Sequence, residues 1–424
     1  MRVFKFKMEL KRAVITGMGA LTPLGNTLDE YWGSLIAGKS GAAPITHFDA
    51  SKFKTQFACE VKNFSPLDHF DRKEARKLDP YAQYALVTAT EAWADSGLSE
   101  DAIDNDRAGV IWGSGIGGLK TFYDECTEFA LGDGTPRFNP FFIPKMIADI
   151  AAGHISMKWN LRGPNFATVS ACASSTNSLI DSFNYIRLGQ ADVIVAGGSE
   201  AAVNQAGIGG FNAMKALSQR NDSPETASRP FDVERDGFVL GEGAGCLIVE
   251  ELEHALARGA KIYAEIVGGG MSADAHHITA PHPEGLGAIN VMRNALRDAG
   301  MQPNEIDYIN VHGTSTPLGD IAESKAIKEV FGDDSFDLNI SSTKSMTGHL
   351  LGAAGAIETI ACVMSIKHGI VPPTINHTTD DPQFDPRLNF TFNKAQKREV
   401  KAALSNTFGF GGHNASVIVK KFAQ

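Results

Sequence analysis

The sequence is poor in the features that mark secreted, membrane-spanning and nucleic-acid-binding proteins. It has five cysteines, an odd number, with no Cys-x-x-Cys pair and no cysteine and histidine spacing typical of a metal site. No apolar run reaches the roughly 18 residues that a helix needs to span a bilayer. Acidic residues outnumber basic ones, 49 to 39, so wrapping by nucleic acid is not expected. We therefore expect no metal, no membrane segment and no nucleic-acid partner.

The start of the chain lacks a secretion signal as well. MRVFKFKMELKRAVITG contains neither an apolar core nor a cleavage site, so we expect a cytoplasmic protein in a reducing compartment. Met8 opens a segment, MELKRAVITGMG, that leads directly into a strand. Residues 1 to 7 are therefore expected to be an extension with no evident role.

Nucleotide-binding signatures are missing too, although glycine-rich turns are present. In TGMGALT the third glycine of a G-x-G-x-x-G motif would have to stand at Thr22, and GSGIGGLK is not followed by a long amphipathic helix. There is no P-loop and no His-Glu-x-x-His motif. We interpret these glycines as tight turns after buried strands, and we expect no cofactor.

Glycine is abundant, with 43 residues, and much of it directly follows short β-branched runs. ADVIVAGGSEAA and AEIVGGG are examples, and such runs predict strands buried on both faces. Helix-period segments lie between the runs, at 80–97 and 287–300, and each ends in glycine. This alternation predicts a layered α/β protein.

The alternation runs twice along the chain. KRAVITGMG and AKIYAEIVGGG each open a half, and each half later has a helix that ends in ADSGL or RDAGM before a new strand. Such internal similarity predicts a duplicated α/β unit. We place the boundary near residue 260, which gives halves at 1–260 and 261–424.

The stretch VSACASST, residues 169 to 176, puts a cysteine among small residues at a strand-to-helix junction. We predict a helix from about 173 to 187, whose positive N-terminal end would lower the pKa of Cys172. Ala171 and Ala173 would leave room for a substrate. A buried structural cysteine fits the same pattern, and position alone does not decide between the two.

Three further strand ends carry polar or flexible groups. Each has an ordinary structural alternative when taken alone. Together with the thiol they form a set suited to acyl transfer, which needs a nucleophile, hydrogen-bond donors or bases, and an oxyanion site. The groups are His312 in NVHGTSTPLGD, Lys344 and His349 in STKSMTGHLLGAAG, and glycines 409, 411 and 412 in NTFGFGGHN.

The motifs ACASS, RPFDVERDGFVLGEGAG, NVHGTSTPLGD, STKSMTGHLLGAAG and NTFGFGGHN occur in the order found in one known family. From about residue 10 to 422 the chain resembles the condensing enzymes of fatty-acid synthesis, the 3-oxoacyl-[acyl-carrier-protein] synthases, and most closely type II. The resemblance implies a thiolase-like fold, with two duplicated halves in a five-layer α-β-α-β-α sandwich. It also implies a homodimer.

The resemblance implies roles for individual residues. Cys172 corresponds to the acylated nucleophile, and His312 and His349 to the pair around the malonyl thioester. The other matches are Lys344, the active-site lysine; Glu358, its carboxylate partner; Phe410, the gate after Gly409, whose backbone N–H joins that of Cys172 in the oxyanion hole; Thr314 and Thr316, which hold the phosphopantetheine arm; and Ile116 and Phe211, which line the acyl pocket.

The implied reaction is a decarboxylating condensation of an acyl chain on Cys172 with malonyl-[acyl-carrier protein]. The substrates are carried on phosphopantetheine, so no free cofactor is implied. The acidic acyl carrier protein is the implied partner, and it would dock on basic side chains. These are Arg72, Lys73, Arg76 and Lys77 in FDRKEARKLD, together with Lys215. A solvated helix face is the alternative for the run at 72–77.

Single residues separate branches of the superfamily. Type III synthases have asparagine in place of His349, thiolases need a second cysteine near the C-terminus, and type I synthases have glycine in place of Ile116. A polyketide-type ketosynthase and a non-catalytic carrier-binding homologue stay open as alternatives. The sequence departs from the type II pattern at His413, where a hydroxyl residue is expected, and at His276, which precedes the expected His277.

Overall fold

The computed structural model describes residues 10–423, so the expected extension at residues 1 to 7 lies outside the described part. The centre of the molecule is a ten-stranded sheet in the order β5-β4-β6-β7-β1-β8-β14-β13-β9-β10. Its strands are β1 (Ala13–Leu21), β4 (Ala108–Gly113), β5 (Asn165–Thr168), β6 (Val193–Glu200), β7 (Gly243–Glu251), β8 (Ala264–Ala273), β9 (Tyr308–Asn310), β10 (Asn339–Ser341), β13 (Ala402–Gly409) and β14 (His413–Lys420).

The two sets of five strands repeat one topology. In each set the two pairs of neighbours nearest the centre of the sheet are antiparallel (β1 with β7 and β7 with β6; β8 with β14 and β14 with β13), and the two outer pairs are parallel. The sets are joined only through a short ladder in which Ala13, Val14 and Ile15 face Ile266, Glu265 and Ala264. The predicted duplicated α/β fold is confirmed. The boundary near residue 260, between α9 (Leu252–Ala257) and β8, stays a prediction.

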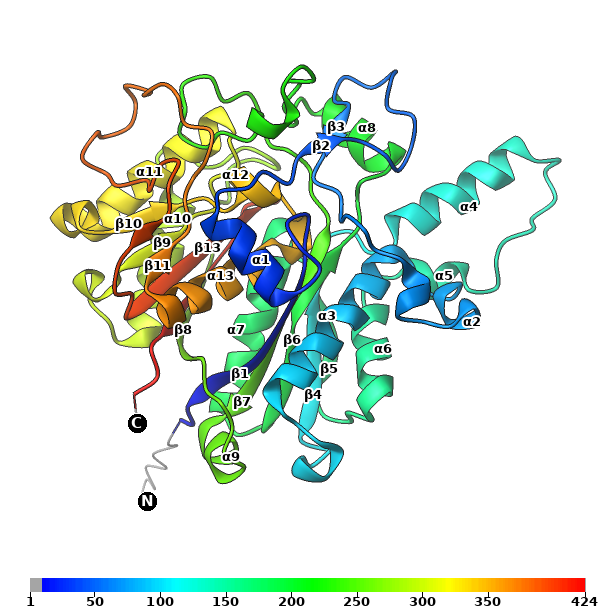
Figure 1. Ribbon diagram of the computed structural model, residues 1–424, viewed down its shortest axis with the longest axis horizontal. Coiled ribbons are helices and arrows are strands. Elements are labelled where there is room, and N and C mark those ends of the chain that lie inside the picture. Colours follow the sequence, from blue (N-terminus) through cyan, green and yellow to red (C-terminus); the bar gives the residue numbers. More distant parts are fainter. Residues whose placement is uncertain (1–9, 424) are drawn as a thin grey trace, which may run out of the picture.

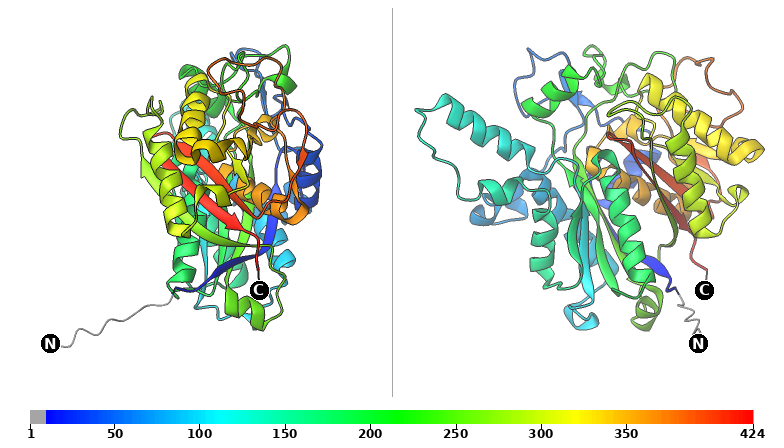
Figure 2. Two further views of the ribbon diagram at one scale, coloured as in Figure 1. Left: turned by 90° about the vertical axis from the view of Figure 1, so that its left-hand side faces the viewer. Right: turned by 180° about the vertical axis from the view of Figure 1, so that it is seen from behind.

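Helices cover both outer faces and fill the space between the two halves of the sheet (Figures 1 and 2). On the first outer face lie α3 (Pro80–Ser96) and α6 (Ile150–Trp159); on the second lie α10 (Leu286–Ala299) and α11 (Pro317–Phe331). Helices α7 (Ser174–Arg187) and α13 (Ala354–His368) form the middle layer and pack on each other. The helices predicted at 80–97 and 287–300 are α3 and α10, and each ends at a glycine with positive φ.

The middle layer is tightly packed because its helices carry small residues. A Cβ atom on Gly355 of α13 would lie 1.9 Å from Oγ1 of Thr176 on α7. Residues 354–366 of α13 are all buried. The small Gly-Ala-Ala-Gly face seen in the sequence therefore lets the two central helices approach each other closely.

A helical arm projects from the body (Figure 1). It consists of α4 (Leu119–Leu131), α5 (Phe142–Met146) and the loop between them, and several of its large apolar side chains are exposed. They are Phe122, Phe129, Leu131, Phe138, Phe141 and Ile143. Within residues 10–423, we find no helix with the length and apolar character needed to cross a membrane.

The remaining elements are short. They are the helices α1 (Leu28–Ile36), α2 (Arg72–Ala75), α8 (Gln205–Ala213) and α12 (Lys344–Thr347), and the strand pairs β2 (Ala43–Pro44) with β3 (Phe57–Ala58) and β11 (Ile370–Val371) with β12 (Gln396–Lys397). Two 3-10 turns precede the middle helices: η3 (Ala171–Ala173) leads into α7, and η7 (Leu351–Ala353) leads into α13.

Candidate active site

A cavity of about 560 Å³ lies where strand ends from both halves meet. Cys172, His312 and His349 all line it, so the structure brings together the three residues predicted to do the chemistry. The lining also includes the predicted gate and substrate-binding residues and one of the predicted docking residues. These are Gly409, Phe410, Thr314, Thr316, Ile116, Phe211 and Lys215.

Cys172 lies in the 3-10 turn η3, just before α7, because the chain turns sharply at Ala171. Ala171 has φ 51°, a left-handed conformation that costs a non-glycine residue about 1–2 kcal/mol. The hydroxyl of Ser174 stabilises the turn: it donates to the carbonyl of Ala171 (2.7 Å) and accepts from the backbone N–H of Ser170 (3.0 Å). The turn directs the cysteine side chain into the cavity.

Burial raises the pKa of the Cys172 thiol to about 12, although the Lys344 charge and the backbone N–H of Phe410 act in the opposite direction. The sequence-based prediction of a lowered pKa is therefore wrong in its net direction. The helix end does favour the thiolate, but the loss of solvent is the larger effect. The raised pKa favours the thiol form of Cys172 over the thiolate.

His349 lies beside the thiol, and one backbone contact fixes its tautomer. Its Nε2 is 3.0 Å from Cys172 Sγ, while its Nδ1 accepts a hydrogen bond from the backbone N–H of Leu351 (3.3 Å). Because Nδ1 is the acceptor, the neutral ring carries its proton on Nε2. His349 therefore presents an N–H to the reaction centre.

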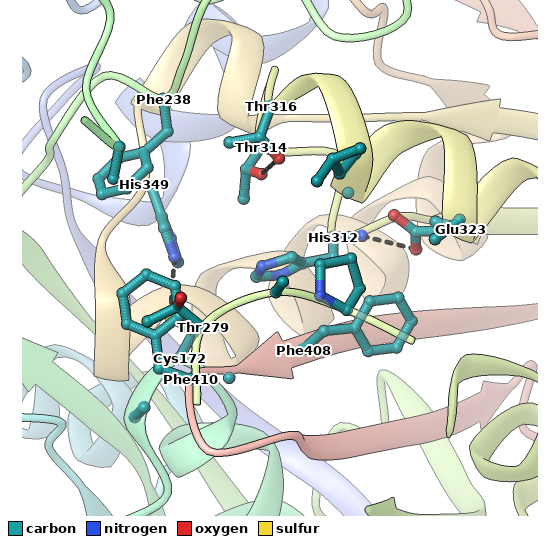
Figure 3. Close-up of a pocket in the computed structure, with 18 of the residues that line it drawn as sticks. Cys172, Phe238, Thr279, His312, Thr314, Thr316, Glu323, His349, Phe408 and Phe410 are labelled. Atoms are coloured by element: carbon teal, nitrogen blue, oxygen red, sulfur yellow. Dashed lines mark hydrogen bonds between the residues drawn. The ribbon is translucent and has the colours of Figure 1, made fainter. Parts of the chain in front are cut away.

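His312 lies opposite, with its ring centroid 5.2 Å from that of His349 and the two rings nearly perpendicular (Figure 3). The carboxylate of Glu323 on α11 accepts from the backbone N–H groups of His312 (2.9 Å) and Gly313 (2.8 Å) and so holds the turn. The sequence analysis missed Glu323. One sequence feature could have indicated it: Glu323 is an acidic residue in a helix that begins directly after a turn rich in glycine and hydroxyl groups.

Both imidazoles are neutral. The pKa of His312 and that of His349 are lowered well below the usual value, first by burial and then by the positive charge of Lys344. Two neutral rings can donate hydrogen bonds to a developing negative charge without carrying a charge of their own. The arrangement therefore suits the stabilisation of an enolate or an oxyanion.

Lys344 and Glu358 form a buried ion pair behind the cavity. The ammonium of Lys344 donates to the Glu358 carboxylate, and both side chains are almost fully buried. Burial raises the pKa of Glu358 to about 7, against the effect of the lysine. Lys344 does not line the cavity, and the predicted catalytic lysine therefore acts on the other residues through its charge.

The turn between β13 and β14 closes one side of the cavity. A Cβ on Gly409 would lie 3.2 Å from the backbone nitrogen of Cys172 and 2.6 Å from the carbonyl oxygen of Ser170, so only glycine fits there. Gly411 and Gly412 have positive φ, and the ring of Phe410 lies 6.5 Å from that of Phe211. The N–H groups of Cys172 and Phe410 thus lie close to the thiol, as an oxyanion hole requires.

The remaining predicted residues divide into two groups. Thr314 and Thr316 share a hydrogen bond of 3.0 Å at the cavity wall, whereas Ile116 is 41 % exposed although it lines the cavity. The four basic residues in and just after α2 do not line the cavity. One of them, Lys77, lies over the ring of Phe141 in the arm. Within this chain the structure does not bring Arg72, Lys73, Arg76 and Lys77 to the cavity with Lys215.

Two family models match the chain. One, described as "Beta-ketoacyl synthase, N-terminal domain", matches residues 11–255. The other, "Beta-ketoacyl synthase, C-terminal domain", matches residues 263–378.

Curated relatives match over nearly the full length. A protein of Coxiella burnetii named 3-oxoacyl-[acyl-carrier-protein] synthase 2 is 50 % identical, with 98 % of this chain and 99 % of the relative covered. A Staphylococcus aureus protein of the same name is 51 % identical, with coverage of 97 % and 99 %.

Solved structures share the fold. A beta-ketoacyl synthase from Burkholderia phymatum superimposes with a TM-score of 0.90 at 36 % identity, covering 98 % of this chain and 100 % of that one. A type II polyketide ketosynthase, described as bound to the hexaketide and in complex with its acyl-carrier protein, gives a TM-score of 0.88 at 33 % identity, with the same coverage.

Proposed function

The chain belongs to the beta-ketoacyl synthase family, and on that premise we propose that it elongates fatty-acyl chains with Cys172 as the residue that holds the growing chain. The activity is the condensation of an acyl group with a malonyl group carried by acyl carrier protein. The observation that carries the assignment of residues is the meeting of Cys172, His312 and His349 in one cavity. No observation favours the polyketide-type or the non-catalytic alternative.

The first step is acyl transfer. The Cys172 sulfur bonds to the carbonyl carbon of the acyl thioester, the bond from that carbon to the carrier sulfur breaks, and the thiol proton leaves with the carrier thiol. Because the thiol is protonated at rest, its proton must move as the new bond forms. The N–H groups of Cys172 and Phe410 bind the oxyanion of the tetrahedral intermediate.

The second step is decarboxylation and condensation. Malonyl-carrier loses carbon dioxide and leaves an enolate, whose oxygen accepts hydrogen bonds from His312 and His349, each worth about 3 kcal/mol in a dry site. The enolate carbon attacks the acyl carbon on Cys172, and the carbon–sulfur bond breaks. The Cys172 thiolate then takes up a proton, and 3-oxoacyl-carrier departs.

The phosphopantetheine arm enters past the pair Thr314 and Thr316, whose hydroxyl groups face the cavity (Figure 3). Ketosynthases of this family take substrates on that arm and need no free cofactor. The carrier protein is the partner, and Lys215 at the cavity attracts its acidic surface. The enzyme works in the cytoplasm, where acyl carriers and reduced thiols occur together.

We further propose a homodimer built on the arm and on β5. The arm exposes its apolar side chains, and β5 is an outer strand of the sheet with an unpaired edge. Ile116 lies at the start of the arm, so a partner subunit packed there would also cover this exposed residue of the acyl pocket. Lys77 lies over the ring of Phe141 in the arm, so the basic residues around α2 would then lie near the subunit boundary.

The assignment of Cys172 is tested by mass spectrometry of the intact protein after incubation with an acyl-carrier protein. We expect a mass gain equal to the acyl group, located on the peptide that contains Cys172 and absent from Cys172→Ala. The matched control is Cys362→Ala, which removes a buried cysteine outside the cavity and should leave the gain intact. An unmodified Cys172, or acylation of another residue, would contradict the proposal.

A further inference from the structure

The two halves repeat the turn that carries the nucleophile. In the first half Ala171 has φ 51° and is followed by Cys172 at the start of a middle helix. In the second half Leu351 has φ 46° and is followed by Gly352, again at the start of a middle helix. Gly352 is therefore the structural counterpart of Cys172.

The strand ends beside these turns also correspond. Strands β6 and β13 hold the same place in their halves and have eight residues each. β13 ends at Gly409, next to the backbone N–H of Cys172, and β6 ends at Glu200, next to the backbone N–H of Gly352. Glycine leaves the first N–H free to bind an oxyanion. The backbone N–H of Gly352, by contrast, donates a hydrogen bond of 3.0 Å to the Glu200 carboxylate.

We infer that Glu200 is a positioning residue: its carboxylate fills the duplicate of the oxyanion site and thereby ties the turn after His349 to the acyl-pocket segment 114–116. The same oxygen accepts from the backbone N–H of Gly115 (2.7 Å). The other oxygen accepts from the N–H of Ile116 and from the hydroxyl of Ser114, both at 3.2 Å. One side chain thus joins both halves of the chain next to the cavity.

The surroundings of Glu200 fit this role. The residue is fully buried, and its carboxylate forms no ion pair with any basic side chain in residues 10–423. A buried carboxylate is costly unless its oxygens are hydrogen-bonded, and here four donors from two separate segments supply the bonds. A Cβ on Gly115 or on Gly352 would lie within 2.8 Å of Glu200 Oε2, so both segments approach the carboxylate as closely as glycine allows.

The consequence for the reaction rests on the proposed function. Ile116 lies where the acyl chain is expected, and Gly352 lies three residues after His349, which faces Cys172. Loss of the carboxylate releases both segments together. Long acyl chains, which reach past Ile116, should suffer more than short ones, whereas a residue that merely stabilises the fold would affect all chain lengths alike.

The test compares Glu200→Ala and Glu200→Gln with Glu91→Ala in the full-length protein. Glu91 is a matched control because its carboxylate also accepts two backbone N–H groups, from Ala20 and Leu28, but none of these residues lines the cavity. For each variant, kcat and KM are measured with short and long acyl-carriers. We expect Glu200→Ala to lose about tenfold or more in kcat/KM for long chains relative to short ones. Glu91→Ala should show no such difference.

Rescue by acetate provides a second measurement, independent of activity. The space vacated in Glu200→Ala keeps its four donors, so acetate should raise its Tm and restore part of the long-chain activity. Neither effect is expected for the parent protein, and in Glu91→Ala acetate should not change the ratio of long-chain to short-chain activity. The inference would be overturned if Glu200→Ala lost kcat/KM equally for all chain lengths and acetate did not raise its Tm. Failure of the proposed function would instead appear as a parent protein whose Cys172 is never acylated.

Discussion

His312 and His349 illustrate how burial sets the chemistry of single residues. Both rings are withdrawn from solvent, with the positive charge of Lys344 behind them, and the pKa of each is well below its usual value. For a histidine, a lowered pKa means that the neutral form persists as the pH falls. The hydrogen-bond donors that the decarboxylation needs therefore remain in place under mildly acidic conditions.

We expect release of carbon dioxide from malonyl-carrier to keep its rate from about pH 7.5 down to about pH 6, where an ordinary histidine would become mostly charged. In Lys344→Met the repelling charge is gone, so the pKa of both rings should rise and the loss of rate should begin at a higher pH. A pH–rate profile of the two proteins tests this. A loss centred near pH 6.5 in the parent protein would contradict the prediction.

At the level of residues, the sequence predicted which residues line the cavity better than it predicted how buried and how strongly hydrogen-bonded they are. Cys172, His312 and His349 were selected from motifs, and they do meet in the cavity, although their roles remain predictions. The pKa of Cys172 was misjudged because burial depends on segments distant in sequence, which no local pattern reveals. Glu323 and Glu200 were missed for the same reason: their partners are backbone groups brought near by tertiary folding.

Among the elements, α13 has the least freedom to change. It is buried along its length, and Gly355 touches α7 at the point where a Cβ would lie 1.9 Å from Thr176 Oγ1. Substitution there must push the central helices apart. Because α7 directly follows the turn with Cys172 and α13 follows His349, stability and activity should be lost together.

We expect Gly355→Ala to lower the free energy of unfolding by about 1–3 kcal/mol through overpacking. The matched control is Gly153→Ala in α6, where the nearest atom to a new Cβ is Ile150 Cδ1 at 3.9 Å. Alanine there should be neutral or stabilise the helix by up to about 1 kcal/mol. Urea denaturation measures both changes, and equal effects of the two substitutions would argue against the packing explanation.

Element boundaries followed from local chemistry where a clear cap was present. The helices predicted at 80–97 and 287–300 are confirmed because Gly97 and Gly300 adopt the left-handed conformation that ends a helix. The helix predicted from about 173 to 187 is likewise confirmed as α7 (Ser174–Arg187), which the 3-10 turn η3 precedes. That turn is held by the Ser174 hydroxyl, a contact that spacing alone does not predict. The arm was not predicted: no long amphipathic helix was expected after GSGIGGLK, but α4 (Leu119–Leu131) begins within that motif and runs for 13 residues.

At the scale of the whole molecule, the arm exposes large apolar side chains that nothing in residues 10–423 of a single chain covers. Leu131 is 84 % exposed, and apolar groups of this number on a projecting element mark an interaction surface. We expect the parent protein to have twice the mass of one chain in solution. Leu131→Glu combined with Ile143→Glu should shift it towards the monomer, because charges would be buried in the interface.

Light scattering coupled to gel filtration measures the mass. Leu256→Glu on α9 serves as the control, because it also places a charge at an exposed leucine but lies far from the arm (Figure 1). A parent protein that is monomeric at micromolar concentration would contradict the proposed dimer. A control variant that dissociates equally would show that the arm is not the interface.

The short ladder between β1 and β8 lies far from the cavity along the strands, so a small rotation there corresponds to a larger displacement at the far strand ends. The two halves of the sheet are hydrogen-bonded at Ala13–Ile15, and the cavity lies towards the other end of β8, after Ala273, where Asp274 lines it. The seven residues of β8 beyond the ladder span about 23 Å, so a rotation of about 2.5° at the ladder displaces the far end by about 1 Å. An error of that size can cost a hundredfold in rate. Substitutions at the ladder, remote from every reacting atom, would therefore change the distance between Cys172 and His349 only as far as the packed helices α7 and α13 let the two halves rotate.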